Sequence, residues 1–455
     1  MKAWYNQGNV SLIDNLRLTT TYNQGDTPLA VNPGAAGRNQ NFTKQERKVQ
    51  EMDLLTEKFA KLGVDSAPGQ EKLQGETKLD LRGCRLPGTP VDFSHGDVDA
   101  FEPLPGSKEA FDAGYLEGGG QAYTEYRGSA SIREDVAEKL SAFTGAKIDP
   151  AKNVILTPGT QGALFLAMGA MAARGDRVAI VEPDYFANRK LAEFFECTIV
   201  PVQMRYFESE HESGLDLREL EEAFRSGVKL FFFSNPNNPT GAVYSDREIR
   251  QIAALARAYG VSLIVDELYS RQLFDGRGYT HLCALEEGPE EMVTIIGPSK
   301  TESLSGYRLG AAFGSEAVIA RMEKLQAIVS LRAAGYCQAV FKVWFAEPEG
   351  FMERRILEHQ AIRDALVKTF RAVPGVRVRP ADAGSYLFVQ LPPLDVSIGE
   401  FVKIVRRLAD VTVTPGTEFG PGFTDSFRIN FSQDKTAALA AVDRLLAVME
   451  RYRRS

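Results

Sequence analysis

Residues 229–269 read KLFFFSNPNNPTGAVYSDREIRQIAALARAYGVSLIVDELY and predict a strand, a helix and a second strand. The two ends of this stretch are apolar runs rich in Val, Ile and Phe, and they are too short to be buried helices. Between them, Ser245 and Glu248 have the spacing of a capping box, and Gly260 suits the end of a helix. A strand, a covering helix and another buried strand together indicate two parallel strands of one sheet.

The same alternation extends in both directions, from about residue 130 to residue 315. Further apolar runs are NVILT at 153–157, RVAIVEP at 177–183 and MVTIIG at 292–297, with segments of helical length between them. The pattern predicts an α/β fold in which helices cover both faces of a mostly parallel sheet. In such a fold, ligands bind at the carboxyl ends of the strands.

Beyond about residue 350 the pattern changes. A long helix is expected over FMERRILEHQAIRDALVKTF, and it is followed by a strand pair (VRVRP and SYLFVQL), another helix and the strand FRINFS. This order predicts a smaller α+β domain, with a boundary near residues 335–350. At the other end, residues 1–80 carry ten basic and ten acidic side chains and contain one expected amphipathic helix at 43–63, so we interpret them as an extension of the body.

Composition excludes several classes of protein. The chain has 455 residues, of which 44% are hydrophobic and 25% charged, and this is typical of a globular protein with more than one domain. A net charge of −7 without a basic patch does not favour a nucleic-acid partner. The four cysteines and four histidines lack the spacing of a disulfide framework or a metal site, so no metal is expected. A polar N-terminus and the lack of a long apolar run predict a cytoplasmic protein without a membrane partner.

Chemistry is concentrated after the predicted strands. In IIGPSKTESLSGYRLG, residues 295–310, Lys300 follows an apolar strand and Arg308 lies eight residues later in a loop bounded by glycines. An amine in a partly apolar pocket can form an imine with an aldehyde, and a guanidinium is suited to a phosphate. A lysine after a strand is more often a solvated loop residue, so its neighbours decide how it is interpreted.

Those neighbours are SNPNNPTG at 234–241 and VDELY at 265–269, each after an apolar run. Together with SKTESLSGYRLG, they resemble the class I and II aminotransferases, which are pyridoxal 5′-phosphate enzymes of fold type I. The resemblance covers roughly residues 90–440. It implies a seven-stranded sheet in a large cofactor-binding domain at 108–335, a small domain formed by 91–107 and 336–455, and an N-terminal extension at 1–90.

The resemblance also implies roles for four residues at the strand ends. Lys300 is similar to the lysine that holds the cofactor as an imine and moves the substrate proton, and Asp266 to the aspartate that keeps the pyridine nitrogen protonated. Asn238 and Tyr269 resemble the pair that donates hydrogen bonds to the phenolic oxygen of the cofactor, which favours its ionised form. A helix cap, a turn Asn and a core-edge Tyr are the structural alternatives for the last three.

Phosphate binding is expected where TPGTQGALFLAMGA, residues 157–170, turns from a strand into a helix. The free N–H groups and the dipole of a helix N-terminus attract an anion. By resemblance, Thr160 and Gln161 contact the phosphate there, together with Ser299 and Arg308. The sequence departs from the common pattern at Gly297, where many family members have a phosphate-binding Ser, so one contact of the family is not expected from this position.

Three further segments resemble parts of the family's site. Tyr185 in VEPDYFAN takes the position of an aromatic ring that stacks on the cofactor. Tyr123 in QAYTEYRG resembles a tyrosine that reaches the phosphate of the neighbouring subunit, which implies a homodimer. Arg428 in SFRINFS matches the arginine that binds the substrate α-carboxylate, and Gly96 in FSHGD lies in the loop near that carboxylate. His95 beside it either faces the substrate or is solvated.

The function predicted from this set is transfer of an amino group from an amino acid to a 2-oxo acid in two half-reactions. A lyase or another amino-acid-modifying enzyme of the same fold is the first alternative, because the same cofactor stabilises several carbanions. A transcription regulator with an aminotransferase-like domain is less favoured, since residues 1–80 have no net charge. A binding protein without activity is disfavoured by the joint presence of six residues, namely Lys300, Asp266, Asn238, Tyr269, Arg308 and Arg428.

The amino donor is left open by the sequence. A dicarboxylic donor requires a second cation, for which the candidates are Arg127, Arg271 and Arg332. Their spacing does not select one of them.

Overall fold

The computed structural model describes residues 54–60, 62, 79–95, 101–117, 123–209 and 212–454. They belong to one compact unit. Residues 54–60 are helical, in agreement with the end of the helix predicted at 43–63, and residues 43–53 of that prediction lie outside the described residues. Within the described part of the chain, none of the helices is both long enough and apolar enough to cross a bilayer.

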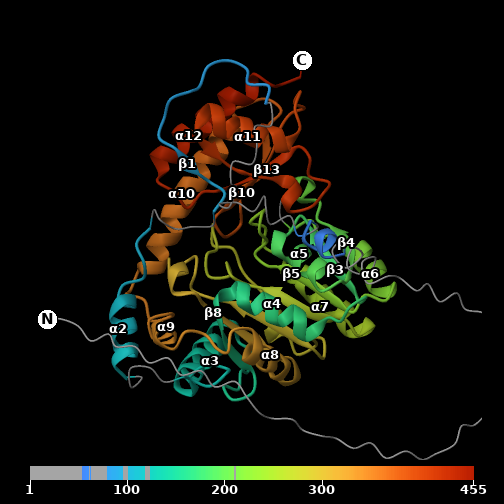
Figure 1. Ribbon diagram of the computed structural model, residues 1–455, viewed down its shortest axis with the longest axis vertical. Helices are drawn as coiled ribbons and strands as arrows, with labels where there is room; N and C mark the ends of the chain where they lie inside the picture. The colour runs from blue at the N-terminus through green and yellow to red at the C-terminus, as the bar shows by residue number, and fades with distance from the viewer. Residues whose placement is uncertain are drawn as a thin grey trace, which may run out of the picture. The chain divides into compact units, whose positions relative to one another are not determined.

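The centre of the molecule is a seven-stranded sheet in the order β2-β8-β7-β6-β5-β3-β4 (Figure 1). Its strands are β2 (Val154–Pro158), β3 (Arg177–Glu182), β4 (Thr198–Gln203), β5 (Leu230–Ser234), β6 (Ser262–Asp266), β7 (Met292–Ile296) and β8 (Leu309–Gly314). Strand β8 runs antiparallel to both of its neighbours, and the pairs from β7 to β4 are parallel. The predicted α/β class is confirmed.

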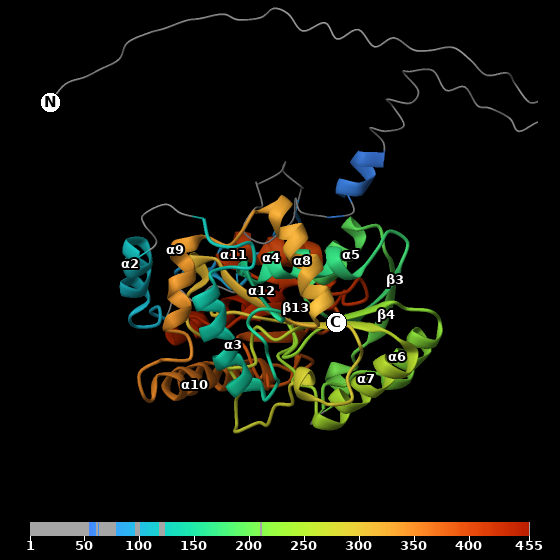
Figure 2. The ribbon, with the colours of Figure 1, turned by 90° about the horizontal axis from the view of Figure 1, so that it is seen from below.

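Helices cover both faces of this sheet. The helices of this part of the chain are α2 (Ser107–Glu117), α3 (Ala130–Thr144), α4 (Gly159–Met171), α5 (Phe186–Phe194), α6 (Leu217–Arg225), α7 (Asp246–Tyr259), α8 (Glu316–Val329) and α9 (Gly335–Gln338). Figure 2 shows α4, α5 and α8 on one side of the sheet and α6 and α7 on the other. Strand β5 explains the arrangement: Phe231 and Phe233 pack in the core under α6 and α7, while Leu230 and Phe232 pack in the core under α4 and α8.

The C-terminal part builds a second, antiparallel sheet in the order β12-β13-β10-β9. Its elements are α10 (Phe351–Arg371), β9 (Arg377–Val378), β10 (Tyr386–Gln390), α11 (Ile398–Ala409), β11 (Val411–Thr412), β12 (Thr414–Pro415), β13 (Ser426–Asn430) and α12 (Lys435–Glu450). Strand β1 (Val91–Asp92) pairs with β11, so residues that precede the large sheet join the C-terminal core. The division into a large and a small domain at the predicted boundaries stays a prediction.

Local signals account for some elements and miss others. The capping box of Ser245 and Glu248 is present, and Gly260 ends α7 with a left-handed φ of 66°, as predicted. The runs TIVPVQ (β4) and LGAAFG (β8) were not predicted as strands. Strand β4 is an edge strand that is exposed in part, and β8 contains Gly and Ala in place of large residues. A Cβ atom at Gly310 would lie 2.4 Å from the carbonyl carbon of Gly159, so the contact between β8 and α4 requires glycine.

The residues that the structure describes also form five short 3-10 helices: η2 (Tyr206–Glu208), η3 (Leu282–Ala284), η4 (Ser305–Tyr307), η5 (Ala339–Lys342) and η6 (Gly416–Glu418).

Candidate active site

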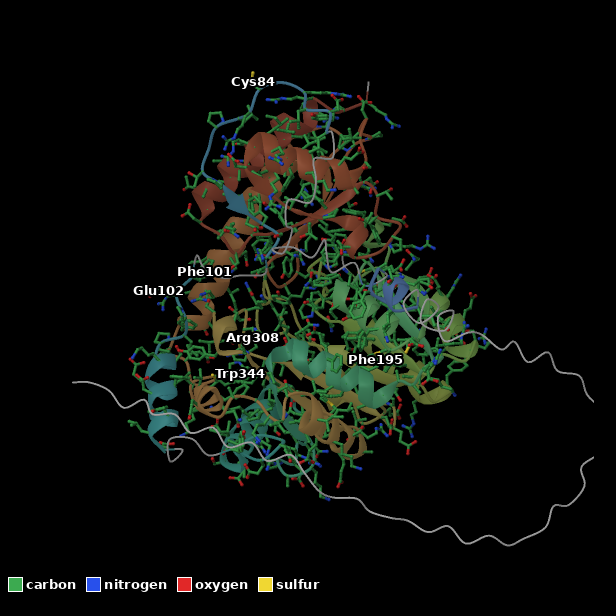
Figure 3. The ribbon with its side chains drawn as sticks, in the orientation of Figure 1. Cys84, Phe101, Glu102, Phe195, Arg308 and Trp344 are labelled. Atoms are coloured by element: carbon green, nitrogen blue, oxygen red, sulfur yellow. The ribbon has the colours of Figure 1, made fainter. Side chains whose placement is uncertain are left out.

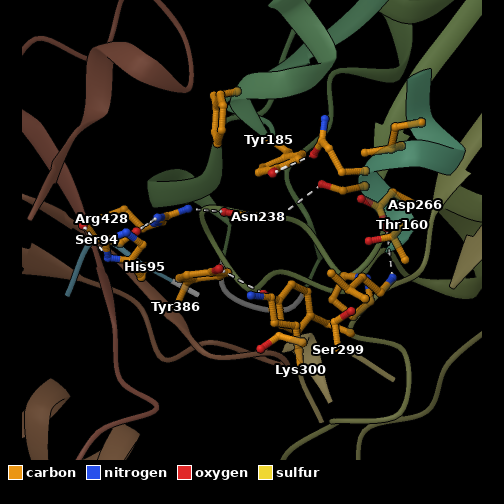
Figure 4. A pocket seen from close by; sticks show the side chains of 18 of the residues that line it. Ser94, His95, Thr160, Tyr185, Asn238, Asp266, Ser299, Lys300, Tyr386 and Arg428 are labelled. Atoms are coloured by element: carbon orange, nitrogen blue, oxygen red, sulfur yellow. Dashed lines mark hydrogen bonds between the residues drawn. The ribbon is translucent and has the colours of Figure 1, made fainter. Parts of the chain in front are cut away.

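A cavity of about 260 Å³ lies where the carboxyl ends of β2, β5, β6 and β7 meet the start of β8. Ten of the predicted site residues line it, namely Thr160, Gln161, Tyr185, Asn238, Asp266, Tyr269, Ser299, Lys300, Arg308 and Arg428. Figure 4 shows Arg428, Ser94 and His95 at one end of this space and Thr160 and Asp266 at the other. The cavity therefore lies at the carboxyl ends of the strands, as expected, and its side chains are up to 268 positions apart in the chain.

Two predicted residues are not in this group. Gly96 lies outside the described residues. Tyr123 does not line the cavity of its own chain; its side chain is 78% exposed and stacks on the guanidinium of Arg332 at 4.2 Å. Its predicted role in a neighbouring subunit therefore stays a prediction.

One end of the cavity is suited to an anion. Helix α4 begins here at Gly159, and no side chain of the described segments caps its first N–H groups. Arg308 lies beside this helix start, as Figure 3 shows, and its Nη1 donates to the carbonyl of Ser305 at 3.0 Å. A Cβ atom at Gly159 would lie 2.7 Å from Nη2 of Arg308, so glycine allows the guanidinium to approach the helix. Uncapped N–H groups, the helix dipole and a guanidinium together attract a phosphate.

Gly297, where the sequence departs from the pattern that it resembles, lies next to this end of the cavity. A Cβ atom there would lie 2.9 Å from the Cγ2 methyl of Thr160 and 3.0 Å from the carbonyl oxygen of Leu309. A side chain at position 297 therefore requires Thr160 to move. Ser299, two residues later, is buried and lines the cavity.

Asp266, at the end of β6, is a buried carboxyl group that lacks a basic partner among the described residues. It is 6% exposed, and its Oδ1 accepts one hydrogen bond, from the backbone N–H of Leu268 at 3.1 Å. Burial raises the pKa of Asp266 to about 7, and the nearby Glu267 adds to the rise. A cation placed next to Asp266 would favour its ionised form.

The middle of the cavity is lined by tyrosines and an amide. The hydroxyl of Tyr269 donates to that of Tyr386 at 3.0 Å, and Tyr185 donates to Oε1 of Gln161 at 3.1 Å. Asn238 lies between these groups and Arg428, and its Oδ1 accepts from Nη1 of Arg428 at 3.0 Å. Tyr386 was not predicted as a site residue, because SYLFVQL reads only as a strand and its neighbours come from distant parts of the chain.

Arg428, on β13, is a buried guanidinium without a carboxylate partner among the described residues. It is 3% exposed, its Nη2 donates to the carbonyl of Ser94 at 2.6 Å, and its Nε has no hydrogen-bond partner. The guanidinium stacks on the rings of Tyr386 at 4.2 Å and Phe419 at 4.8 Å. A buried, fixed cation of this kind is suited to a carboxylate ligand.

The structure separates the three arginine candidates for a second carboxylate. Arg127 pairs with Glu323 at 2.6 Å, and Arg271 pairs with both Glu302 and Glu347. These two side chains are therefore engaged within the protein. Arg332 stacks on Tyr123 and Tyr126 and has no carboxylate partner in the described part of the chain.

A second polar cluster lies behind Asp266. Nδ1 of His281 lies 2.6 Å from Oε2 of the buried Glu267, and Cys283 is close to both. Desolvation raises the pKa of the Cys283 thiol, and Glu267 raises it further. Linear spacing did not predict this cluster, because Glu267 reaches the other two residues through the fold. We interpret the contact between Glu267 and His281 as structural, because it holds the loop after β6 against the end of that strand.

Comparison with known proteins shows which family the chain belongs to. A family model described as aminotransferase class I and II matches residues 90–445. This chain belongs to that family. The aminotransferase resembles an aspartate aminotransferase of Rhodobacter sphaeroides, whose crystal structure is 59% identical, covers 88% of this chain and all of that one, and has a TM-score of 0.83.

Curated relatives are more distant. An aspartate aminotransferase of Pyrococcus horikoshii is 28% identical over 76% of this chain and 86% of its own. An arginine–pyruvate transaminase of Pseudomonas aeruginosa is 26% identical over 74% of this chain and 84% of its own. The predicted family, fold type and activity are confirmed: the protein is a pyridoxal 5′-phosphate-dependent aminotransferase that acts on amino acids and 2-oxo acids.

The residues of the cavity fit this cofactor. The uncapped start of α4 and Arg308 offer an anion site for its phosphate. At the same end of the cavity, Asp266 offers a buried carboxyl group without a basic partner among the described residues, suited to a protonated ring nitrogen. The cavity thus offers N–H and guanidinium donors for a phosphate and a buried carboxyl group for a cation.

Proposed function

We propose that this aminotransferase uses aspartate or another dicarboxylic amino acid as donor. The proposal is supported by the aspartate aminotransferase that is 59% identical over 88% of the chain, and by Arg428. The buried guanidinium of Arg428, without a carboxylate partner in the described chain, is the single observation that carries substrate binding. Arg332 is the candidate for the second carboxylate, because the other two arginines are engaged in ion pairs.

We assign the cofactor contacts as follows. The first N–H groups of α4 and Thr160, Gln161, Ser299 and Arg308 would hold its phosphate, and Asp266 would pair with its ring nitrogen. Asn238 and Tyr269 would donate to its phenolic oxygen, and Tyr185 would lie against its ring. When bound, the cofactor supplies an electrophilic carbonyl group and a ring that withdraws electrons from the bonds at the substrate Cα.

The protein's own residues then divide the work. The amine of Lys300 would hold the cofactor, and it would take and return the proton at the substrate Cα in each half-reaction. Arg428 orients the substrate by its α-carboxylate, so that the bond to be broken is presented to Lys300. Asp266, once ionised, stabilises positive charge on the ring nitrogen. Burial of Asp266 and Arg428 keeps water from weakening both interactions.

We also propose that the active unit is a homodimer. Large apolar side chains are exposed on and near α2 and α8: Tyr115, Leu116, Tyr123, Tyr126, Ile328, Val329 and Leu331. Seven exposed apolar residues on or near these two helices are more than the scattered exposed hydrophobic side chains that are usual on a protein surface. In such a dimer we expect Tyr123, and Arg332 stacked on it, to reach toward the cavity of the other copy. A cytoplasmic location, expected from the sequence, is part of the same proposal.

The test is an absorbance screen of the purified enzyme against the twenty amino acids, followed at the visible band of the bound cofactor. Aspartate or glutamate is expected to convert the band to that of the amine form at the lowest concentration, and a 2-oxo acid is expected to restore it. Conversion by an apolar amino acid at lower concentration than by any dicarboxylic one would refute the donor assignment. Steady release of ammonia without the amine form would indicate a lyase.

A further inference from the structure

Asp184 is a buried carboxyl group to which the mechanism above gives no task. It lies between the end of β3 and the start of α5 and is 2% exposed. Its oxygens accept from the backbone N–H groups of Tyr185 at 2.7 Å and of Ser234 at 3.1 Å, and from the hydroxyl of Ser234. Burial raises the pKa of Asp184 to about 8, which shows that an ionised carboxylate at this position is strongly disfavoured by desolvation.

The hydrogen bonds continue from Asp184 toward the substrate end of the cavity. The Oγ of Ser234, which bonds to Asp184, also accepts from the backbone N–H of Asn238 at 3.1 Å. Asn238 in turn accepts from Nη1 of Arg428 through its Oδ1 at 3.0 Å. The backbone N–H of Asp184 donates to the carbonyl of Phe419, whose ring stacks on the Arg428 guanidinium. All of these residues are buried.

This geometry has two consequences for Asn238. Its backbone N–H donates to Oγ of Ser234, and this hydrogen bond fixes the position of the Asn238 backbone. Because its Oδ1 is taken by Arg428, the amide group is oriented and its NH₂ is the part that can donate into the cavity. An Asn238 that shifted would lose both the acceptor for Arg428 and the donor for the cofactor oxygen.

We propose that Asp184 and Ser234 are positioning residues that fix Asn238 and, through it, the guanidinium of Arg428 for the substrate carboxylate. The inference rests on the proposed role of Arg428 and deepens it. It assigns no contact with substrate or cofactor to Asp184 or Ser234 themselves.

The test compares Ser234→Ala with Ser213→Ala in the holoenzyme. Ser213 is a close match: it is buried, its Oγ donates to the carboxylate of Glu248 at 2.7 Å, and it accepts from the backbone N–H of Leu215 at 3.1 Å. Binding of succinate, an unreactive dicarboxylate, is measured by calorimetry, together with KM and kcat for aspartate and the melting temperature. Both variants are expected to melt lower, but only Ser234→Ala is expected to bind succinate about 10-fold more weakly and to raise KM more than it lowers kcat.

Equal succinate affinity in Ser234→Ala and Ser213→Ala would overturn the inference. Asp184→Asn, which keeps one side-chain acceptor, is the second variant if Ser234→Ala does not fold, and the same loss of succinate affinity is expected from it. Arg428→Gln separates the two proposals. If Arg428→Gln binds succinate as the parent does, the assignment of Arg428 fails; if it loses binding while Ser234→Ala keeps it, only the role of Asp184 and Ser234 fails.

Discussion

Replacing Asp266 by Asn is expected to flatten the pH dependence of stability of the cofactor-free protein. Burial raises the folded-state pKa of Asp266 to about 7, against an ordinary value of 3.8. Between these values the folded protein holds a proton on Asp266 that the unfolded chain has released. Raising the pH in this window therefore favours the unfolded chain, so the stabilisation by the neutral carboxyl is present below about pH 4 and is lost by about pH 7.

The size of the effect follows from that shift. In the middle of the window the loss is about 1.4 kcal/mol per pH unit, and it integrates to about 2 kcal/mol between pH 5 and pH 7. Asn cannot titrate, and its Oδ1 can still accept the N–H of Leu268. The free energy of unfolding of Asp266→Asn should therefore fall about 2 kcal/mol less than that of the parent over this range.

The assay is urea unfolding at pH 5, 6 and 7 after the cofactor has been removed, followed by circular dichroism. Asp246→Asn is the control: Arg250 and Thr280 lower the pKa of the exposed Asp246, so this group is ionised in both states throughout the window and its removal should leave the slope unchanged. Asp184, whose pKa is about 8, contributes a slope of the same sign to every variant. Equal slopes for the parent and Asp266→Asn would refute the reasoning.

Three other predictions concern the proposed roles. Lys300→Ala is expected to lose at least about 100-fold in activity and to retain no cofactor after borohydride treatment and unfolding; label retained at the parent level would contradict the assignment. Ile328→Glu, at a side chain that is 80% exposed, is expected to convert a dimeric parent to monomers in light scattering at micromolar concentration, and a monomeric parent would contradict the homodimer. Arg332→Leu is expected to lower kcat/KM for aspartate about 10- to 100-fold while that for alanine is unchanged; equal losses for both donors would remove Arg332 from the second-carboxylate site.

The sequence predicts which residues come together in the cavity where their positions depend on short segments. Lys300 and Arg308 follow β7 in one stretch of chain, and Asp266 ends β6, so their order along the chain is enough to place them at one edge of the sheet. The cap at Ser245 is equally local, since its partner is three residues away. The positions of these residues follow from the local backbone and the order of the strands, so they can be predicted without knowing the tertiary packing.

Relations that depend on tertiary packing could not be predicted in this way. Tyr386 comes next to Tyr269 across 117 positions, and Ser234 meets Asp184 across 50. Arg271 looked as available as Arg332 in the sequence, but the fold surrounds it with Glu302 and Glu347. Hydrophobic periodicity sets which face of an element is buried, but not which polar groups of two distant elements meet there.

The two ends of the cavity share one physical property. Asp266 and Arg428 are buried without an oppositely charged partner among the described residues, and the N–H groups that start α4 have no cap. Each of these features lowers the stability of the protein alone, because burying a polar or ionised group costs free energy unless it has a partner. A cofactor with a cationic ring and a phosphate, together with a substrate carboxylate, supplies all three counter-charges. Selection for binding therefore explains why the fold keeps groups that folding by itself would replace.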